Sequence, residues 1–222
     1  MGAANSNPDD AVNGIVLKST PVGEYDRRVV LLTAERGKIS CFARGARRQN
    51  SHLMGPSTEM TFGRFVIRSG KSSNVMADAE IVNYFGGLRS DMDACFYGMY
   101  FLEVMDYITR ENNDEAMLLK LLYVCLRALE KPSVPRTLVR AVFELKCVVI
   151  EGEFREPDDR TRQKLLPDTV YAMLFIASAP PEKLFSFTLS DEVLSELVRF
   201  SRKAASDYFR HSFKSAELLD VL

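Results

Sequence analysis

The stretch Thr33-Ala34-Glu35-Arg36-Gly37-Lys38-Ile39-Ser40-Cys41-Phe42-Ala43-Arg44 decides the fold of this chain. Its short turn, Glu35-Arg36-Gly37, indicates a tight hairpin, and the apolar–polar alternation after the turn indicates a half-buried strand. Ile39, Cys41 and Ala43 share one face of this strand, because successive strand side chains point in opposite directions. The opposite face carries Lys38, Ser40, Phe42 and Arg44.

The same pattern continues on both sides of this hairpin and predicts a small antiparallel barrel. The expected strands cover residues 12–20, 25–34, 38–46, 59–69 and 75–84. Five strands with one longer connection after the third, residues 47–57, favour an OB-type barrel, and an SH3-like barrel is the main structural alternative. We expect residues 1–11 to be a disordered leader and residues 12–85 to form an OB-fold domain.

After Gly86-Gly87 the apolar spacing becomes helical, which predicts a helical domain over residues 86–222. A capping box, Ser90 with Asp93, begins the first helix. Its inward face is expected to hold Phe96, Met99, Tyr100, Val104 and Tyr107. Further helices are predicted over residues 114–130, 135–150, 169–178, 190–209 and 216–222, with a charged loop over 153–167. The predicted fold class is therefore α+β, an OB-fold followed by a helical domain.

Positive charge is concentrated in the predicted barrel. Eight cationic residues and a single acid, Glu59, give a net charge of +7 between Arg36 and Lys71, although the 222-residue chain carries −1. In the fourth strand, Phe65 and Ile67 share one face while Arg64 and Arg68 share the other. Two strands therefore present cationic outer faces, although a solvated barrel face is the simpler alternative.

A cationic surface that also contains an aromatic side chain suits single-stranded nucleic acid, because it neutralises phosphates and stacks on bases. The candidate nucleic-acid-binding residues are Arg36, Lys38, Phe42, Arg44, Arg47, Arg48, Arg64, Arg68 and Lys71.

Other classes of function find little support in the sequence. The two histidines and four cysteines form no metal-spaced pair, and no nucleotide-binding, serine-hydrolase or zinc-protease motif occurs. No apolar run approaches the ~20 residues needed to span a bilayer. We therefore expect a cytoplasmic protein that is not an enzyme, has no cofactor and does not enter a membrane.

Four segments resemble the N-terminal domain of the RecO family of bacterial repair and recombination proteins. They are Gly14-Ile15-Val16-Leu17-Lys18, Gly23-Glu24-Tyr25-Asp26-Arg27, Thr33 to Ser40, and Ala43-Arg44-Gly45-Ala46-Arg47-Arg48. Farther along, Phe143-Glu144-Leu145 and Phe213-Lys214-Ser215 also resemble the family.

The resemblance implies an OB-fold joined to a helical domain, with Arg27, Lys38, Arg44, Arg47 and Arg48 as phosphate contacts. It implies binding of single- and double-stranded DNA, annealing of complementary strands, and an association with the nucleoid. It also implies contact with the acidic tail of single-stranded-DNA-binding protein and, together with RecR, loading of RecA.

For the acidic tail, the expected cations beside an apolar groove are Arg136, Arg140 and Lys146, although for any one of them a solvated cation on a helix face is the simpler interpretation. Many members of the family carry a four-cysteine zinc site in the helical domain. Residues 153–178 contain no cysteine here, so we predict no zinc.

Two other functions share parts of this pattern. An OB-type RNA-binding module would have the same barrel electrostatics, and preference for DNA annealing over structured RNA would separate the two. A protein-interaction scaffold would use the helices as its working surface, and would bind no nucleic acid at low salt.

Overall fold

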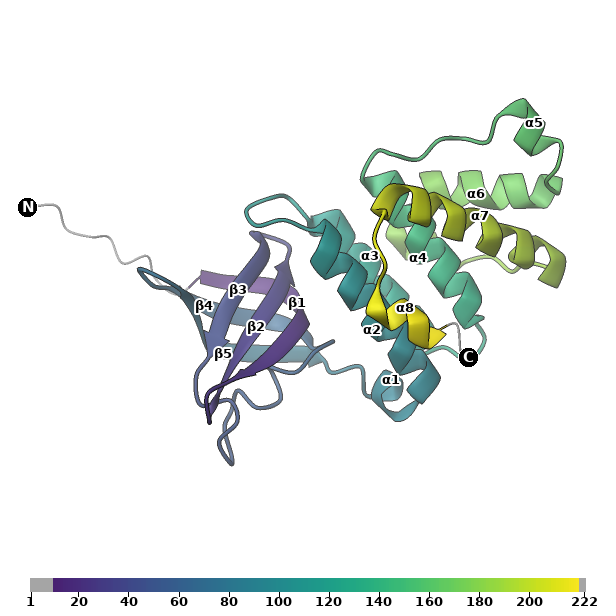
Figure 1. Ribbon diagram of the computed structural model, residues 1–222. Helices are drawn as coiled ribbons and strands as arrows, with labels where there is room; N and C mark the ends of the chain where they lie inside the picture. The colour runs from purple at the N-terminus through teal and green to yellow at the C-terminus, as the bar shows by residue number, and fades with distance from the viewer. Residues whose placement is uncertain (1–9, 220–222) are drawn as a thin grey trace, which may run out of the picture. The chain divides into compact units, whose positions relative to one another are not determined.

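The computed structural model describes residues 10–219, and the described chain forms a five-stranded barrel followed by helices (Figure 1). The strands are β1 (Asp10–Val22), β2 (Asp26–Thr33), β3 (Gly37–Ala43), β4 (Phe62–Ser69) and β5 (Asn74–Asn83). The closed order is β1-β2-β3-β5-β4, in which only β3 and β5 are parallel. The predicted OB-type barrel is confirmed.

The barrel core is built from the alternate residues that the sequence pattern selects. Ile39, Cys41 and Ala43 of β3 are buried, as are Phe65 and Ile67 of β4. The residues between them are half-buried or exposed. The predicted orientation of these two strands is therefore correct, and the cationic side chains of both strands lie on the outer face.

The predicted leader, residues 1–11, overlaps the first strand at its last two residues. Residues 1–9 lie outside the described part of the chain, but Asp10 and Ala11 belong to β1. They extend the ladder with β4, where Asp10 is opposite Ile67 and Ala11 is opposite Val66.

The helices are α1 (Gly86–Ser90), α2 (Met92–Ile108), α3 (Ala116–Leu129), α4 (Arg136–Ile150), α5 (Asp159–Arg162), α6 (Pro167–Ser178), a 3₁₀ turn η1 (Pro181–Lys183), α7 (Asp191–Phe209) and α8 (Lys214–Leu219). Three of these elements, α1, α5 and η1, were not predicted. The short α5 forms inside the predicted loop because the Asp158 side chain accepts a hydrogen bond from the Thr161 backbone N–H at 2.8 Å.

Helix α2 differs from its prediction in its cap and its orientation. Asp91, not Ser90, caps the helix by accepting from the Ala94 N–H at 3.1 Å. Met99 and Tyr107 are exposed, whereas Tyr100 and Phe101 are buried. Phe101 stacks on Phe143 of α4, with 4.1 Å between ring centroids. The helix is turned toward this aromatic contact, which carries Met99 and Tyr107 outward.

The chain forms two compact units, and their boundaries differ from the single domain boundary that was predicted after residue 85. One unit holds the barrel up to Gly86 together with Leu102–Leu119, and the other holds Gly87–Phe101 together with the residues from Lys120 onward. In the second unit α4 packs against α6 and α7, and α6 packs against α7. Part of the predicted helical domain, Leu102–Leu119, is thus structurally associated with the barrel.

Candidate nucleic-acid interface

One row of side chains crosses the outer face of the barrel from β2 to β4. Arg28 pairs with Phe42, Phe42 pairs with Val75, and Val75 pairs with Arg68. The two arginines are exposed, and the two apolar side chains are half-buried. The row therefore places an aromatic ring and an aliphatic side chain between two cations.

Arg28 is a site residue that the sequence analysis missed. It precedes the positively charged segment between Arg36 and Lys71. The alternation of β2, however, places it on the face of the strand opposite to that of the buried Val29 and Leu31. Its Nε donates to Ser40 Oγ at 2.9 Å, which holds the side chain along the outer face. Strand alternation in β2 was the signal that could have identified it.

A second group of cations follows β3, where the chain is tied to the β1–β2 turn. The Arg47 backbone N–H donates to the Tyr25 carbonyl at 2.9 Å, and Arg47 Nη1 donates to the Gly23 carbonyl at 3.0 Å. The Gly45 N–H donates to Asp26 Oδ1 at 2.7 Å. These bonds fix the backbone of the arginine-rich loop and leave Arg44, like Arg47, exposed.

Tyr25 adds a second aromatic ring to this group. The Arg48 guanidinium lies 4.9 Å from the centroid of the Tyr25 ring, a cation–π contact. A hydrogen bond to Glu24 raises the pKa of Tyr25, so the phenol is neutral at physiological pH. The ring is 42% exposed and is available for stacking.

The β4–β5 hairpin adds Lys71 beside the end of β3. Asn74, at the start of β5, pairs with Cys41, and its side-chain Nδ2 donates to the Ser40 carbonyl at 3.1 Å. The exposed Lys71 belongs to the loop that leads into this strand. In OB-folds, the face of strands 2 and 3 and the loops β1–β2 and β4–β5 are the usual oligonucleotide-binding region.

We call these residues the barrel surface: Arg28, Phe42, Arg44, Arg47, Arg48, Arg68, Lys71 and Tyr25. Arg28, Arg44, Arg47, Arg48 and Lys71 form no ion pair with any carboxylate in the described part of the chain. Concentrated positive charge without nearby counter-charge attracts polyanions.

Four predicted site residues lie outside the barrel surface. Arg27 has the inward orientation of Val29, and its Nη1 donates to Ser19 Oγ at 2.9 Å. Arg64 is opposite the acidic Glu80 of β5 in the strand register. Arg27 is therefore turned toward the inside of the barrel, and Arg64 has an acidic residue opposite it on the neighbouring strand.

Arg36 and Lys38, the other two, are held by acids. Arg36 pairs with Asp10 at 3.6 Å. Lys38 Nζ donates to the backbone carbonyl of Asp106 at 2.5 Å and lies 3.3 Å from Asp106 Oδ1. At this end of the β2–β3 hairpin, Gly37 has φ +62° and has no room for a Cβ, which would lie 2.7 Å from the Arg110 carbonyl. The chain around Asp106 and Arg110 therefore covers this part of the barrel.

The three cations proposed for an acidic partner tail do not form one surface. Lys146 is buried, and its Nζ donates to the carbonyls of Ile176, Ala177 and Ala179 at 2.8–3.0 Å. Arg140 is buried too, with its Nε 2.7 Å from Glu144 Oε1. The prediction of three accessible cations is wrong for these two, because tertiary contacts that helical spacing does not reveal surround them.

Arg136 alone of the three lies beside a cavity. It pairs with Asp91 and Asp93 and lines a space of about 440 Å³ where α3 ends and α4 begins. Lys131 also lines this space, together with apolar atoms of Leu129, Pro132, Val134 and Pro135.

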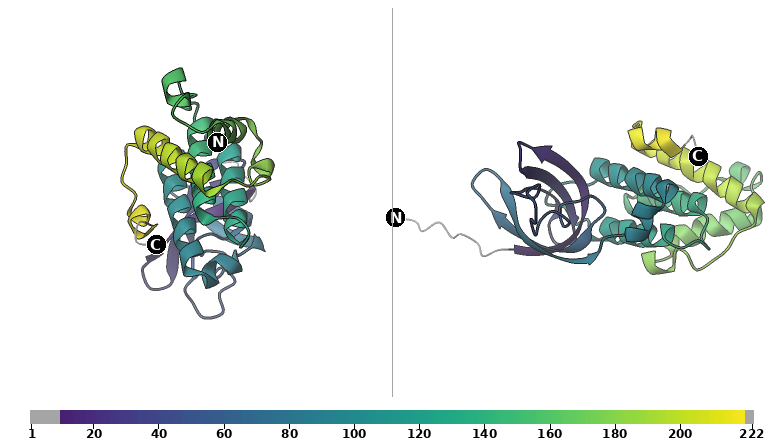
Figure 2. Two further views of the ribbon diagram at one scale, coloured as in Figure 1. Left: turned by 90° about the vertical axis from the view of Figure 1, so that its right-hand side faces the viewer. Right: turned by 90° about the horizontal axis from the view of Figure 1, so that it is seen from below.

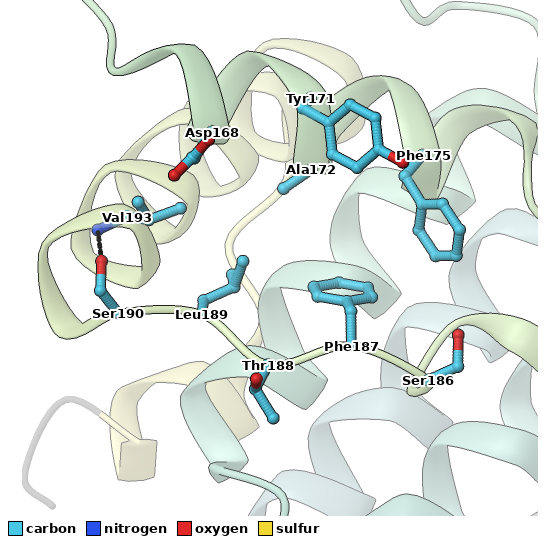
Figure 3. Close-up of a pocket in the computed structure, with 10 residues that line it drawn as sticks. All are labelled: Asp168, Tyr171, Ala172, Phe175, Ser186, Phe187, Thr188, Leu189, Ser190 and Val193. Carbon is cyan, nitrogen blue, oxygen red and sulfur yellow. Dashed lines mark hydrogen bonds between the residues drawn. The ribbon is translucent and has the colours of Figure 1, made fainter.

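A second cavity, of about 320 Å³, opens between α6, the segment before α7, and α7 (Figure 3). Phe175 and Phe187 meet edge to face in its wall, with 5.3 Å between centroids. Asp168 is the only charged side chain among its described lining residues. The cavity beside Lys131 and Arg136 is also lined by two carboxylates, Asp91 and Glu130, but it has two cations as well, whereas this second cavity has none among its described lining residues.

The cysteines are not suited to a four-thiolate zinc site. Cys41, Cys125 and Cys147 are buried in the barrel, α3 and α4. Burial raises the pKa of Cys41 to about 12 and raises the pKa of the other two, which opposes the thiolate form that zinc requires. Among residues 10–219, no group of three or more histidine, cysteine or acidic side chains is arranged to hold a metal ion.

No helix within the described range combines the length and apolar character needed to cross a membrane.

Comparison with known proteins places the chain in a family. The model for the N-terminal domain of recombination protein O matches residues 11–85, and the C-terminal model matches residues 89–154. DNA repair protein RecO of Acetivibrio thermocellus is 24% identical, across 95% of this chain and 96% of that protein. The Clostridium acetobutylicum protein is 27% identical across 94% and 96%, and the Bacillus pumilus protein is 32% identical across 65% and 56%. The chain belongs to the RecO family of DNA repair and recombination proteins.

Proposed function

We propose that the barrel surface binds single-stranded DNA through its phosphates and bases together. The observation that carries this proposal is the row Arg28–Phe42–Val75–Arg68, continued by the arginine loop after β3. Arginines release counterions from phosphates, and the rings of Phe42 and Tyr25 offer faces to unstacked bases. Base stacking of this kind is tolerant of sequence, as a repair protein requires.

The same surface supports annealing of complementary strands without a chemical step. Two strands repel one another through their phosphates, and a surface that neutralises several phosphates lowers this repulsion. Bases that leave the rings of Phe42 and Tyr25 can then pair. Double-stranded DNA is a weaker ligand in this scheme, because its bases are not free to stack. The proposed role is therefore that of a mediator with no catalytic residue or cofactor, acting on DNA of the cytoplasmic nucleoid.

Charge reversal in the arginine loop tests the proposal. The variant Arg44→Glu/Arg47→Glu/Arg48→Glu should bind a fluorescein-labelled 20-nucleotide single strand at least about 100-fold more weakly at low salt. The slope of log affinity against log salt should fall by about 2 units, since three phosphate contacts at about 0.7 each are lost. A structured RNA hairpin of equal length serves as competitor, and preferential binding of the hairpin would favour an RNA-binding role.

A matched control separates the loop from total charge. The variant Arg155→Glu/Arg160→Glu/Lys164→Glu makes the same change of charge at three exposed positions of the helical unit. It should bind the single strand within about threefold of the parent protein. Equal losses in the two triple variants, or an affinity of the parent protein that does not vary with salt, would refute the proposal.

For the acidic tail of single-stranded-DNA-binding protein, we propose the cavity beside Lys131 and Arg136. A cation adjoins apolar atoms of Pro132 and Val134 there, which suits a peptide with carboxylates and a terminal aromatic ring. Lys131→Glu should abolish binding of a nine-residue acidic peptide that ends in Phe, measured by calorimetry. Lys183→Glu, an exposed reversal elsewhere in the helical unit, should not change it. Equal peptide affinity in both variants would exclude this cavity.

Cooperation with RecR and loading of RecA complete the proposed role. Annealing of complementary strands coated with single-stranded-DNA-binding protein should proceed with the parent protein and should stop in the arginine-loop variant. Addition of RecR should increase RecA assembly on the coated strand, measured by ATP hydrolysis. An arginine-loop variant that supports both reactions at the parental rate would separate this role from the barrel surface.

A further inference from the structure

The C-terminal part of α7 and the residues that follow it carry a concentration of positive charge that the proposed function does not use. Between Leu197 and Ala216 there are five lysines and arginines and one acid, Asp207, so this segment has a net charge of +4. Its cations are Arg199, Arg202, Lys203, Arg210 and Lys214.

The cations of α7 lie on the side of the helix that does not pack. The helix buries Val193, Leu197, Ser201, Ala205 and Phe209, which repeat every four residues and pack toward α4 and α6. Arg199, Arg202, Lys203 and Arg210 are all exposed. We call these four residues the α7 stripe. It extends from Arg199 to Arg210, the residue that follows the last residue of α7, or over about 16 Å at 1.5 Å per residue. Figure 2 shows α7 at the outside of its helix group.

Nearby acids neutralise little of the α7 stripe. Arg202 and Lys203 form no ion pair with a carboxylate in the described part of the chain, and Arg199 lies 4.0 Å from Glu196. Glu196 already accepts hydrogen bonds from the Leu166 N–H and the Thr169 hydroxyl, which lower its pKa.

The other acids near α7 lie away from the stripe. Glu151 accepts a hydrogen bond from Tyr208, which lies on the packed side of the helix. Glu192 shares the side of the stripe but precedes Arg199 by about two turns. Asp207 is therefore the one acid within the length of the stripe.

The surface of α7 suits phosphates rather than an acidic peptide with an apolar end. Among the described residues of α7, no large apolar side chain is exposed. The residues between the cations on this side are small and polar, such as Ser206. A peptide anchored by an aromatic residue would need an apolar groove, whereas a sugar–phosphate backbone needs only cations at regular intervals.

We propose that the α7 stripe is a second nucleic-acid-binding surface, which holds the phosphate backbone of DNA without reading bases. It contains no aromatic side chain, so it differs from the barrel surface in being indifferent to whether the bases are paired. A protein with both surfaces can hold two DNA molecules, and this bridging role rests on the proposed function of the barrel. Binding of DNA by the α7 stripe does not depend on the barrel proposal.

The test begins from the arginine-loop variant Arg44→Glu/Arg47→Glu/Arg48→Glu, in which the barrel surface is disabled. It should retain weak binding of a 20-base-pair duplex at low salt, measured by fluorescence anisotropy. Adding Arg199→Gln/Arg202→Gln/Lys203→Gln should lower that residual affinity at least tenfold. Adding Arg155→Gln/Arg160→Gln/Lys164→Gln, a matched loss of charge in the same unit, should lower it less than threefold.

The stripe variant with an intact barrel gives an independent result. It should bind a single 20-nucleotide strand within about threefold of the parent protein, yet anneal two complementary strands at least tenfold more slowly. Parental annealing together with unchanged duplex binding would overturn the second surface. A third outcome separates the two proposals. If the arginine-loop changes do not weaken DNA binding but the α7 changes do, the α7 stripe is established and the barrel proposal is refuted. Circular dichroism checks that each variant is folded.

Discussion

The cations that follow β3 and the cations of α4 look alike in the sequence, but the fold uses them in opposite ways. Arg44, Arg47 and Arg48 are exposed, with no carboxylate of the described chain paired to them. Arg140 and Lys146 are buried and bonded to Glu144 and to the end of α6. The first group is available to a polyanion, and the second group stabilises the helical unit. Substitutions should therefore separate DNA affinity from stability.

The largest effect on stability is expected at the Arg140–Glu144 pair. Arg140→Met should lower the free energy of unfolding by about 3–5 kcal/mol, because it leaves the buried Glu144 carboxylate without its cation. Urea denaturation measures the loss. The double variant Arg140→Met/Glu144→Leu should recover much of it, since no unpaired charge remains. Single-strand affinity should be unchanged in both variants, and a stable Arg140→Met protein would contradict the structural role.

Lys146 should give the next effect. Lys146→Met should cost about 2–3 kcal/mol, because three carbonyls at the end of α6 lose their donor while the methionine side chain fills the space. Lys131→Met, an exposed control, should change the stability by less than about 0.5 kcal/mol. Loss of acidic-peptide binding without loss of stability in Lys146→Met would mean that Lys146 faces solvent.

On the barrel, Phe42→Ala should weaken single-strand binding without unfolding the protein. A stacked base contributes about 1–3 kcal/mol, so affinity should fall roughly tenfold, measured by anisotropy with a labelled oligonucleotide. Val82→Ala removes a 69% exposed apolar side chain from β5 and should leave the affinity unchanged. The same loss in both variants would show that Phe42 contributes no specific stacking.

The smallest change is expected at Lys38. Because this side chain is already bound to Asp106, Lys38→Ala should alter single-strand affinity by less than about twofold. Arg44→Ala, which removes an unpaired cation from the opposite end of β3, should lower the affinity by about three- to fivefold. If Lys38→Ala has the larger effect, DNA displaces Asp106 and Lys38 belongs to the barrel surface.

The barrel was predictable from the sequence because its strands obey a local rule. Alternation in β3 and β4 correctly assigned Ile39 and Phe65 to the core and Phe42 and Arg64 to the outside. The strand ends shifted by no more than a few residues. The same rule, applied to β2, would also have identified Arg28.

The failures share a different cause, which is dependence on residues far along the chain. Lys38 is held by Asp106, 68 residues later, and Lys146 is held by carbonyls about 30 residues later. Helical spacing placed Met99 inward, but the stack of Phe101 on Phe143 turns α2 away from that orientation. Local patterns give the direction of a side chain relative to its own element, and they do not give the partner that it meets.

The ring of strands is closed between β3 and β5 by only two register pairs, Cys41 with Asn74 and Phe42 with Val75. Because this parallel ladder is so short, the barrel should open locally here most readily. Its amides should exchange with deuterium sooner than those of the long β4–β5 ladder. Phe42 of the barrel surface and its neighbour Val75 form one of these two pairs. An oligonucleotide bound across this pair would hold β3 and β5 together. Its binding should therefore slow deuterium uptake by the amides of these two strands.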